Sequence, residues 1–209
     1  KYRDNPVLGN PGIEDFRDPK VIWHDKTKRW VMVLAVRDRV ELYVSEDLKE
    51  WEKSGEFGKT DGAHGGVWEC PDLFALTVEG TETQKWVMLV SINPGGIHGG
   101  SATQYFVGTF DGETFLNDNP ATTTLWVDYG KDNYAGVTWS DIPESDGRRI
   151  FLGWMSNWQY ANVVPTERWR SAMTIPRTLH LQNTSEGVRL ASRAVKELEE
   201  IRQTAFDIS

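Results

Sequence analysis

Residues 28–34 read KRWVMVL, and residues 84–90 read QKWVMLV. The two tryptophans of this repeat, Trp30 and Trp86, lie 56 positions apart, and a looser third copy, RRIFLGWM, occupies residues 148–155. Each copy follows an apolar stretch and a polar turn, and a further apolar stretch comes after it. Four short strands per unit, repeated at such spacings, are typical of β-propeller blades. A β-sandwich would not repeat one motif at the same place in each unit.

The repeat predicts an all-β chain in which residues 1–191 form a partial β-propeller domain. About three four-stranded blades are expected, near residues 16–57, 69–118 and 132–191. Three blades do not close a propeller, because four is the usual minimum. We therefore expect an open arc whose two ends carry apolar faces that other structure must cover.

The end of the chain has a different pattern. Val195, Leu198 and Ile201 recur at three-residue spacing within SRAVKELEEIRQT, which predicts a helix over residues 192–204. We interpret residues 192–209 as a helical linker that leads away from the propeller.

The composition excludes several classes of function. The chain has 209 residues, a net charge of −8 and no basic cluster, so nucleic-acid binding is not expected. No apolar run is long enough to cross a membrane. The single cysteine and the four scattered histidines give neither an internal disulfide nor a metal-binding pattern, and no cofactor is expected. Most of the ten tryptophans should pack in a rigid core, and a few could stack on sugar rings.

Two acidic motifs stand at the start of the first two units. The sequence FRDPKV covers residues 16–21, and ECPDLF covers residues 69–74. Proline lacks an amide donor and biases the residue before it toward extended backbone, so each motif predicts the beginning of a strand. Since first strands line the channel of a propeller, Asp18 and Glu69 should converge on one funnel, with Trp68 and Cys70 giving Glu69 an apolar setting.

A pair of carboxyl groups at one mouth is what glycoside hydrolysis requires. An acid before a proline is also a common turn former, and for either motif alone that interpretation is favoured. Two motifs at equivalent blade positions favour the functional interpretation. The third unit has Asp132-Asn133-Tyr134-Ala135 at the corresponding place.

These motifs, in this order, resemble the signatures of glycoside hydrolase family 32, which contains invertases, levanases and inulinases. Further stretches agree with the resemblance, namely NPGG at 93–96, DYGKD at 128–132, GWMSNW at 153–158 and WRSAM at 169–173. The resemblance implies a five-bladed propeller that releases fructose from sucrose, inulin or levan with retention of configuration.

The same resemblance implies roles for single residues. Glu69 would be the general acid/base, and Asp18 would stabilise the transition state with Arg17 beside it. Further residues would line the sugar pocket: Cys70, Asp132, Tyr134, Trp154, Asn157 and Trp158.

The chain departs from the family pattern at the nucleophile. The family uses an Asp in an NDPNG-type motif on its first blade, and NDNP at 117–120 matches this only superficially. We expect the nucleophile, about two N-terminal blades and a C-terminal β-sandwich to lie outside this chain. The N-terminal remainder of the same protein is thus an expected partner, besides the sucrose or fructan substrate. An extracellular or periplasmic location would suit polymeric fructans.

Two alternatives stay open. One is a related furanosidase that acts on arabinose-containing glycans, and the other is a sugar-binding propeller without catalytic activity. An NDPNG-like motif upstream would favour an enzyme over a binding protein.

Overall fold

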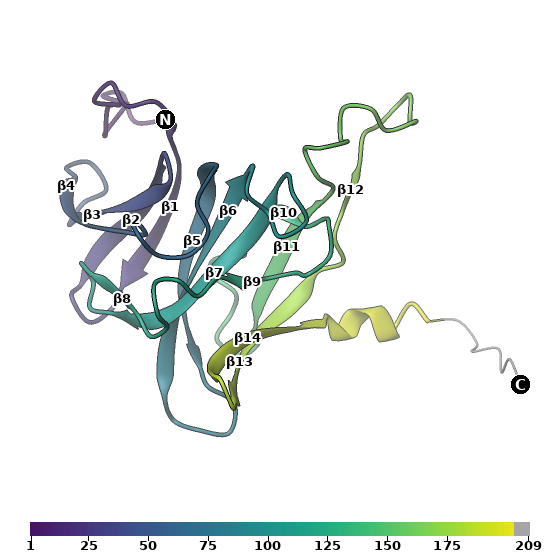
Figure 1. The fold of residues 1–209 in the computed structure, drawn as a ribbon. Helices are drawn as coiled ribbons and strands as arrows, with labels where there is room; N and C mark the ends of the chain where they lie inside the picture. Colours follow the sequence, from purple (N-terminus) through teal and green to yellow (C-terminus); the bar gives the residue numbers. More distant parts are fainter. Residues whose placement is uncertain (203–209) are drawn as a thin grey trace, which may run out of the picture.

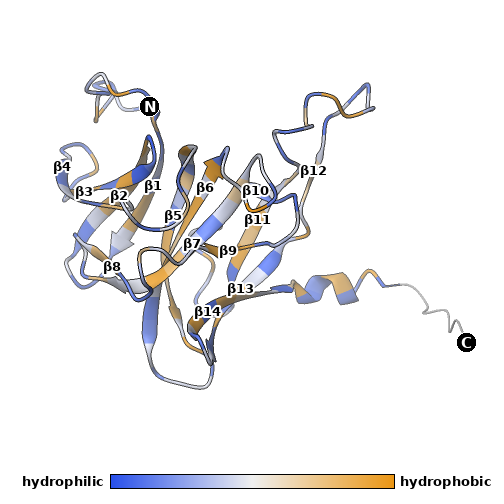
Figure 2. Cartoon of the chain, viewed as in Figure 1, coloured by the Kyte–Doolittle hydropathy of each residue, from blue (hydrophilic) through white to orange (hydrophobic). Residues whose placement is uncertain are grey.

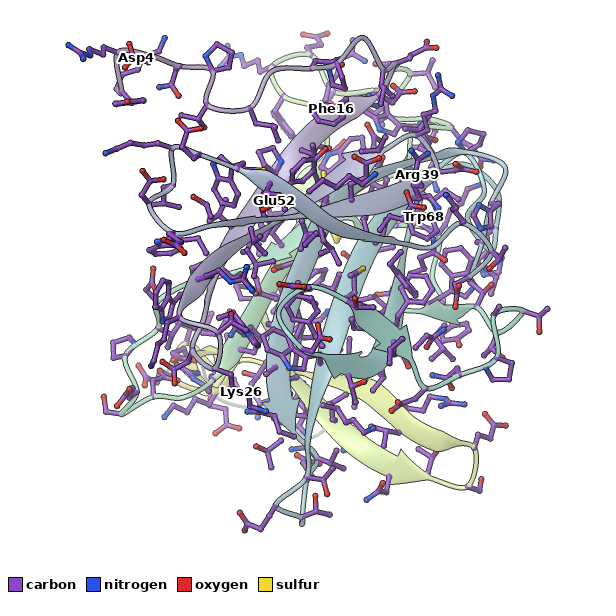
Figure 3. All side chains as sticks on the ribbon, turned by 90° about the vertical axis from the view of Figure 1, so that its left-hand side faces the viewer. Asp4, Phe16, Lys26, Arg39, Glu52 and Trp68 are labelled. Atoms are coloured by element: carbon purple, nitrogen blue, oxygen red, sulfur yellow. The ribbon has the colours of Figure 1, made fainter. Side chains whose placement is uncertain are left out.

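The computed structural model describes residues 1–202, and almost all of its regular structure is antiparallel β-sheet (Figure 1). The first sheet has four strands in sequence order: β1 (Phe16–His24), β2 (Arg29–Val36), β3 (Arg39–Ser45) and β4 (Glu52–Phe57). Figure 3 looks onto this sheet, with Phe16 of β1, Arg39 of β3 and Glu52 of β4 labelled.

The second and third sheets repeat this order. The second sheet contains β5 (Val67–Thr77), β6 (Gln84–Asn93), β7 (Ala102–Phe110) and β8 (Phe115–Asn117), and β9 (Leu125–Trp126) pairs with β7. The third sheet contains β10 (Tyr134–Thr138), β11 (Arg149–Met155), β13 (Arg177–Thr184) and β14 (Gly187–Ala194), and β12 (Ala172–Met173) pairs with β11. The prediction of about three four-stranded blades is confirmed.

The repeated motif forms the second strand of each of the first two sheets. Because side chains alternate across a strand, Val31 and Val33 of β2 point toward the second sheet, while Met32 and Leu34 point to the opposite face. Both sets are buried, which explains why this strand is apolar throughout instead of alternating. Figure 2 shows the apolar residues concentrated in the strands of the three sheets.

The cores lie between neighbouring sheets. Trp68 and Phe106 fill the space between the first and second sheets, where Trp68 is 0% exposed. Leu89 and Phe151 belong to a separate cluster between the second and third sheets. Burying a side chain of this size stabilises the fold by about 1.5–3 kcal/mol. The sheets are therefore held face to face, as blades are.

The outer face of the first sheet is partly covered by the chain itself. Leu8 and Ile13 of the N-terminal segment pack on Met32 and Leu34, and Trp51 adds to the same cluster. At the other end of the arc, on β10 and just after it, Val137 and Trp139 are 41% and 48% exposed. The expected apolar face is thus more open at the third sheet than at the first.

The predicted helix from residue 192 to residue 204 is wrong over most of its described length. Residues 192–194 complete β14, in which Ala194 pairs with Arg177, and one turn of 3-10 helix, η1 (Lys196–Glu199), follows. Val195 is buried and donates its amide to the carbonyl of Pro176 at 3.1 Å. Strand pairing with β13 therefore overrides the local apolar spacing. Residues 203–204 of that helix lie outside the described residues.

None of the helical structure in residues 1–202 has the length and apolar character that crossing a bilayer requires.

Candidate functional site

The first strand of each sheet contains a β-bulge, where the pairing with the second strand slips by one residue. The slips lie between Arg17 and Lys20 in β1, between Glu69 and Asp72 in β5, and between Tyr134 and Val137 in β10. The first residue of each bulge has a positive φ: 59° at Asp18, 48° at Cys70 and 52° at Ala135. Residues other than glycine rarely have a positive φ. A bulge changes the direction in which the neighbouring side chains point.

The bulges correct the predicted equivalence of the two acids. Asp18 and Cys70 occupy the same bulge position, and each precedes a proline. Glu69 instead matches Arg17 of the first blade and Tyr134 of the third. The prediction was wrong by one residue because an extra residue separates the acid from the proline in ECP.

The carboxyl group of Glu69 lies where the three first strands meet. Arg17 donates from Nη2 to Oε1 of Glu69 at 2.8 Å and from Nε at 3.3 Å. The phenol of Tyr134 donates to Oε2 of the same carboxyl group. The Glu69 side chain is 20% exposed, so the group is held in place but can still be reached from solvent. Each blade therefore supplies one member of this trio.

The partners of Glu69 are themselves well defined. Hydrogen bonds with Asp15 and then with Glu69 raise the pKa of Arg17, so its positive charge is fixed. Burial, followed by the hydrogen bond with Glu69, raises the pKa of Tyr134, which keeps its hydroxyl protonated and donating. Both groups thus restrain the carboxyl from fixed positions.

The expected apolar setting of Glu69 is only partly present. Trp68 points away from the carboxyl group into the core between the first two sheets, and its indole N–H donates to the carbonyl of Ala63 at 3.0 Å. Alternation along β5 explains this, because consecutive side chains leave opposite faces. Charge and hydrogen bonding, more than apolar contact, define the surroundings of Glu69.

Asp18 contacts the residue next to Glu69. Its Oδ2 accepts the amide of Cys70 at 3.0 Å and lies 3.6 Å from the Cys70 sulfur. Burial, with the nearby charge of Asp18, raises the pKa of Cys70 to about 12, so its thiol stays protonated and poorly nucleophilic. The two acids are therefore linked through the bulge of β5.

Aromatic rings continue outward from the trio. The ring centroids of Tyr134 and Trp154 are 6.3 Å apart, and those of Trp154 and Trp158 are 5.0 Å apart. Trp158 is 47% exposed and lies in the long loop between β11 and β12, which rises above the third sheet (Figure 1). This row of rings could stack on the apolar face of a sugar that reaches Glu69.

Asn157, expected in the sugar pocket, is 0% exposed. Its Nδ2 donates to the carbonyls of Lys131 at 2.8 Å, Ser101 at 3.0 Å and Gly99 at 3.4 Å. Its Oδ1 accepts the amides of Gln159 at 2.9 Å and Ser101 at 3.3 Å. With every polar atom engaged, Asn157 ties together the loops around the site, and the structure argues against direct contact with a sugar.

Asp132 lies apart from the Glu69 trio. It accepts a hydrogen bond from the hydroxyl of Tyr160, and burial raises its pKa. It lines a hollow of about 680 Å³ together with Tyr160, Arg177 and Met155, and Glu69 does not line this hollow. Asp132 could contact a sugar only at some distance from the acid/base candidate.

Sequence reasoning missed three residues that follow the bulges, Lys20, Asp72 and Thr138. Asp72 is 0% exposed and accepts hydrogen bonds from Thr138. The ECPD motif showed the sequence position of Asp72, but its burial is visible only in the structure.

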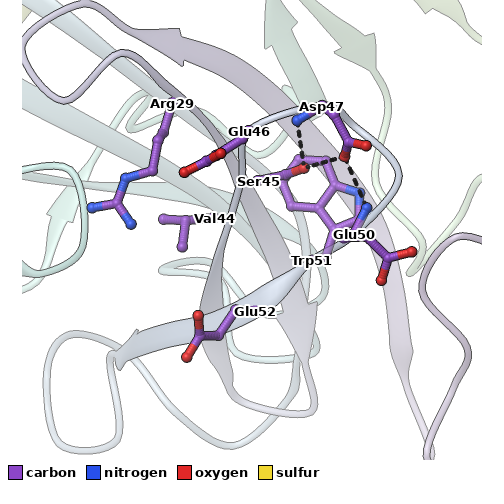
Figure 4. A pocket seen from close by; sticks show the side chains of 8 residues that line it. All are labelled: Arg29, Val44, Ser45, Glu46, Asp47, Glu50, Trp51 and Glu52. Carbon is purple, nitrogen blue, oxygen red and sulfur yellow. Dashed lines mark hydrogen bonds between the residues drawn. The ribbon is translucent and has the colours of Figure 1, made fainter.

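A second hollow lies at the turn between β3 and β4, and no residue of the three bulges lines it (Figure 4). Its lining includes four acidic side chains, and Asp47 accepts the amides of Lys49 and Glu50 to form the turn. This arrangement is explained by turn formation, and it brings no pair of catalytic groups together. Within residues 1–202, no three histidine, cysteine or acidic side chains are grouped to hold a metal ion.

The chain is similar to known proteins in sequence and in fold. The chain is 60% identical over 206 residues to a levanase from Bacillus subtilis (strain 168). This alignment covers 98% of the chain and 30% of that levanase. It is 46% identical over 183 residues to an extracellular exo-inulinase from Meyerozyma guilliermondii, covering 87% of this chain and 34% of that protein. The chain thus spans about a third of the length of these relatives.

A solved structure of fructofuranosidase from Schwanniomyces occidentalis complexed with fructose has the same fold. Its TM-score is 0.84 at 38% identity, with 93% of this chain and 38% of that chain covered. Residues 1–193 match the Glycosyl hydrolases family 32 N-terminal domain. Because this match covers most of the sequence, the chain belongs to glycosyl hydrolase family 32.

Proposed function

We propose that the protein containing this chain hydrolyses β-fructofuranosidic bonds and releases fructose from levan, inulin or sucrose, with Glu69 as general acid/base. The observation that carries the proposal is the convergence of three first strands on one carboxyl group, held by Arg17 and Tyr134. The family supports the reaction class, and the names of the levanase and exo-inulinase relatives support a fructan substrate.

In the first step, Glu69 would donate its proton to the leaving-group oxygen as the bond from that oxygen to the anomeric carbon breaks. A carboxylate nucleophile would bond to the anomeric carbon from the opposite face of the ring. We propose that this nucleophile lies outside the 209 residues, because no NDPNG-like motif occurs in them.

In the second step, water would attack the anomeric carbon and release the nucleophile, while Glu69 takes a proton from that water. Glu69 would then be protonated again and ready for the next cycle. Arg17 and Tyr134 would keep its two oxygens in one orientation through both steps, since each binds a different oxygen.

The other site residues would act on the sugar itself. The negative charge of Asp18 would stabilise the positive charge that develops on the fructosyl ring. Trp154 and Trp158 would stack on the sugar or on the unit next to it, since their rings continue outward from Tyr134. The extracellular exo-inulinase relative supports a location outside the cell, where polymeric fructans are found.

A substrate panel tests the proposal. The full-length protein is incubated with sucrose, inulin, levan and aryl α-arabinofuranoside, and the free sugars are measured. We expect fructose from at least one fructan or from sucrose, and no arabinose. Release of arabinose alone would show the other furanosidase activity, and sugar binding without any hydrolysis would show a binding propeller. Either result would overturn the proposal.

The stereochemistry provides an independent check. Double displacement inverts the anomeric centre twice, so fructose should first appear as the β-furanose. Proton NMR in D₂O during the first minutes of turnover distinguishes this from release of the α-anomer, which would require a single displacement.

A further inference from the structure

Just after the three bulges along their strands, one polar residue from each blade joins a common network of hydrogen bonds and one ion pair. Oδ2 of Asp72 accepts the amide of Thr138 at 2.6 Å and its hydroxyl at 2.8 Å. Nζ of Lys20 lies 3.3 Å from Oδ1 of Asp72 and donates to the carbonyl of Thr138 at 2.9 Å. Lys20 comes from β1, Asp72 from β5 and Thr138 from β10, so the contacts close a triangle between blades.

The acid of the network is buried and both of its oxygens are hydrogen-bonded. The Asp72 side chain is 0% exposed and the Lys20 side chain is 16% exposed. Oδ1 of Asp72 also accepts the amide of Leu73 at 2.9 Å, so both of its oxygens are engaged. A buried ion pair is costly unless further hydrogen bonds satisfy it, and it contributes little to stability compared with well-packed apolar side chains. Its presence here therefore calls for a reason other than stability.

The position of the network suggests that reason. Lys20 and Asp72 are the residues at which regular pairing resumes after the bulges of β1 and β5. Three residues before Asp72 on β5, the carboxyl group of Glu69 is held by hydrogen bonds from Arg17 and Tyr134, which come from the two neighbouring blades. The spacing of the three first strands thus decides whether these partners reach the same carboxyl group.

We propose that Asp72, with Lys20 and Thr138, is a positioning residue that fixes the spacing of the three bulges and thereby holds the Glu69 carboxyl group in the orientation for proton transfer. This inference rests on the proposed function of Glu69 and goes beyond it by naming what aligns that group. A displacement of about 1 Å at such a site costs roughly 100-fold in rate.

The test uses Asp72→Asn in the full-length protein, compared with wild type and with Glu41→Gln. Glu41 is a matched control because it is also buried, at 4% exposed, and is bonded to Tyr43, Arg39 and Lys53 on the first sheet. Each protein is assayed on sucrose, whose leaving group needs a proton, and on an aryl β-fructofuranoside with an acidic phenol, whose leaving group needs little assistance.

For Asp72→Asn we expect kcat on sucrose to fall by about 100-fold, with KM changed by less than about threefold. On the aryl fructoside the loss should be roughly tenfold smaller, because the misplaced group is the proton donor. Glu41→Gln should keep kcat on both substrates. Thr138→Val removes only the hydrogen bond from the Thr138 hydroxyl to Asp72 and keeps the side-chain shape. It should show the same pattern more weakly, and it replaces Asp72→Asn in the test if that variant does not fold.

Two outcomes would overturn this inference alone. One is wild-type kcat in the folded Asp72→Asn protein with only a lower Tm, and the other is an equal loss on both substrates. Wild-type protein that releases no fructose from any substrate would overturn the proposed function and this inference together. Fructose release by the wild-type protein therefore shows whether a negative result concerns the role of Asp72 alone or the proposed function as well.

Discussion

At the scale of single residues, the contact of Asp18 with Cys70 matters most after Glu69 itself. The carboxylate of Asp18 accepts the Cys70 amide and therefore stands at the bulge that presents Glu69. An amide in its place would keep the size but lose the negative charge that we propose acts on the reacting sugar.

We predict that Asp18→Asn in the full-length protein lowers kcat/KM on sucrose or levan by about 100-fold or more, because charge stabilisation at the transition state is lost. Steady-state kinetics measure this. Asp25→Asn is the control, since Asp25 lies on the β1–β2 turn with its side chain 82% exposed. Equal activity of the Asp18 variant and the control variant would remove Asp18 from the site.

The raised pKa of Cys70 predicts slow reaction with thiol reagents. At pH 9, a thiol with a pKa of about 12 has roughly 500-fold less thiolate than one with its ordinary pKa of 9.0. Alkylation by iodoacetamide should therefore be slow in the folded protein and should speed up as the pH rises toward 12. Guanidinium-unfolded protein is the control, and similar rates in both states at pH 9 would contradict the assignment.

At the scale of elements, the bulge is the unit that builds the site. Gly136, the second residue of the β10 bulge, has no room for a side chain, because an added Cβ would come within 2.2 Å of the Phe151 ring. Phe151 is fully buried between the second and third sheets and cannot move aside cheaply.

Gly136→Ala should destabilise the protein by about 1–3 kcal/mol through overpacking. Urea unfolding of the full-length protein measures this. Gly9→Ala is the control, because a Cβ at Gly9 meets nothing within 4 Å and its φ is not positive. An unchanged urea midpoint for Gly136→Ala would show that the third bulge is less tightly packed than the structure indicates.

The strands could be predicted from the sequence, and the bulges could not. The repeat of KRWVMVL and QKWVMLV marks β2 and β6, because both strands are buried on both faces. Alignment of Pro19 with Pro71 would have matched Glu69 with Arg17, but the bulge itself depends on pairing with a neighbouring strand, which no local pattern reveals. The helix predicted from residue 192 failed for the same reason, because β13 supplies pairing partners that local spacing does not reveal.

At the scale of the whole molecule, the site is assembled between blades. Glu69 and Asp18 were identified from motifs and a family resemblance. The contact of Tyr134 with Glu69, however, joins residues 65 positions apart, and no local pattern encodes it. The burial of Asn157 could not be foreseen either, because a motif gives the residue and not its burial. The order of the motifs along the chain therefore indicates the family, but it does not show which side chains face the substrate.

We propose that the nucleophile lies outside the 209 residues. We therefore predict that the 209-residue chain alone releases no fructose from sucrose, inulin or levan. The assay compares this chain with the full-length protein at equal concentration, with circular dichroism as the check on folding. Robust fructose release by the 209-residue chain would show that one of its own carboxylates serves as the nucleophile.

The most direct test of the central claim is kcat of Glu69→Gln in the full-length protein on its best fructan or on sucrose. Glutamine keeps the shape of the side chain but cannot transfer the proton, so we predict a loss of about 10²–10⁴-fold. Glu82→Gln, at an exposed turn position, should keep full activity, and both proteins should have the wild-type circular dichroism spectrum. A Glu69→Gln protein that turns over at the wild-type rate would contradict the account.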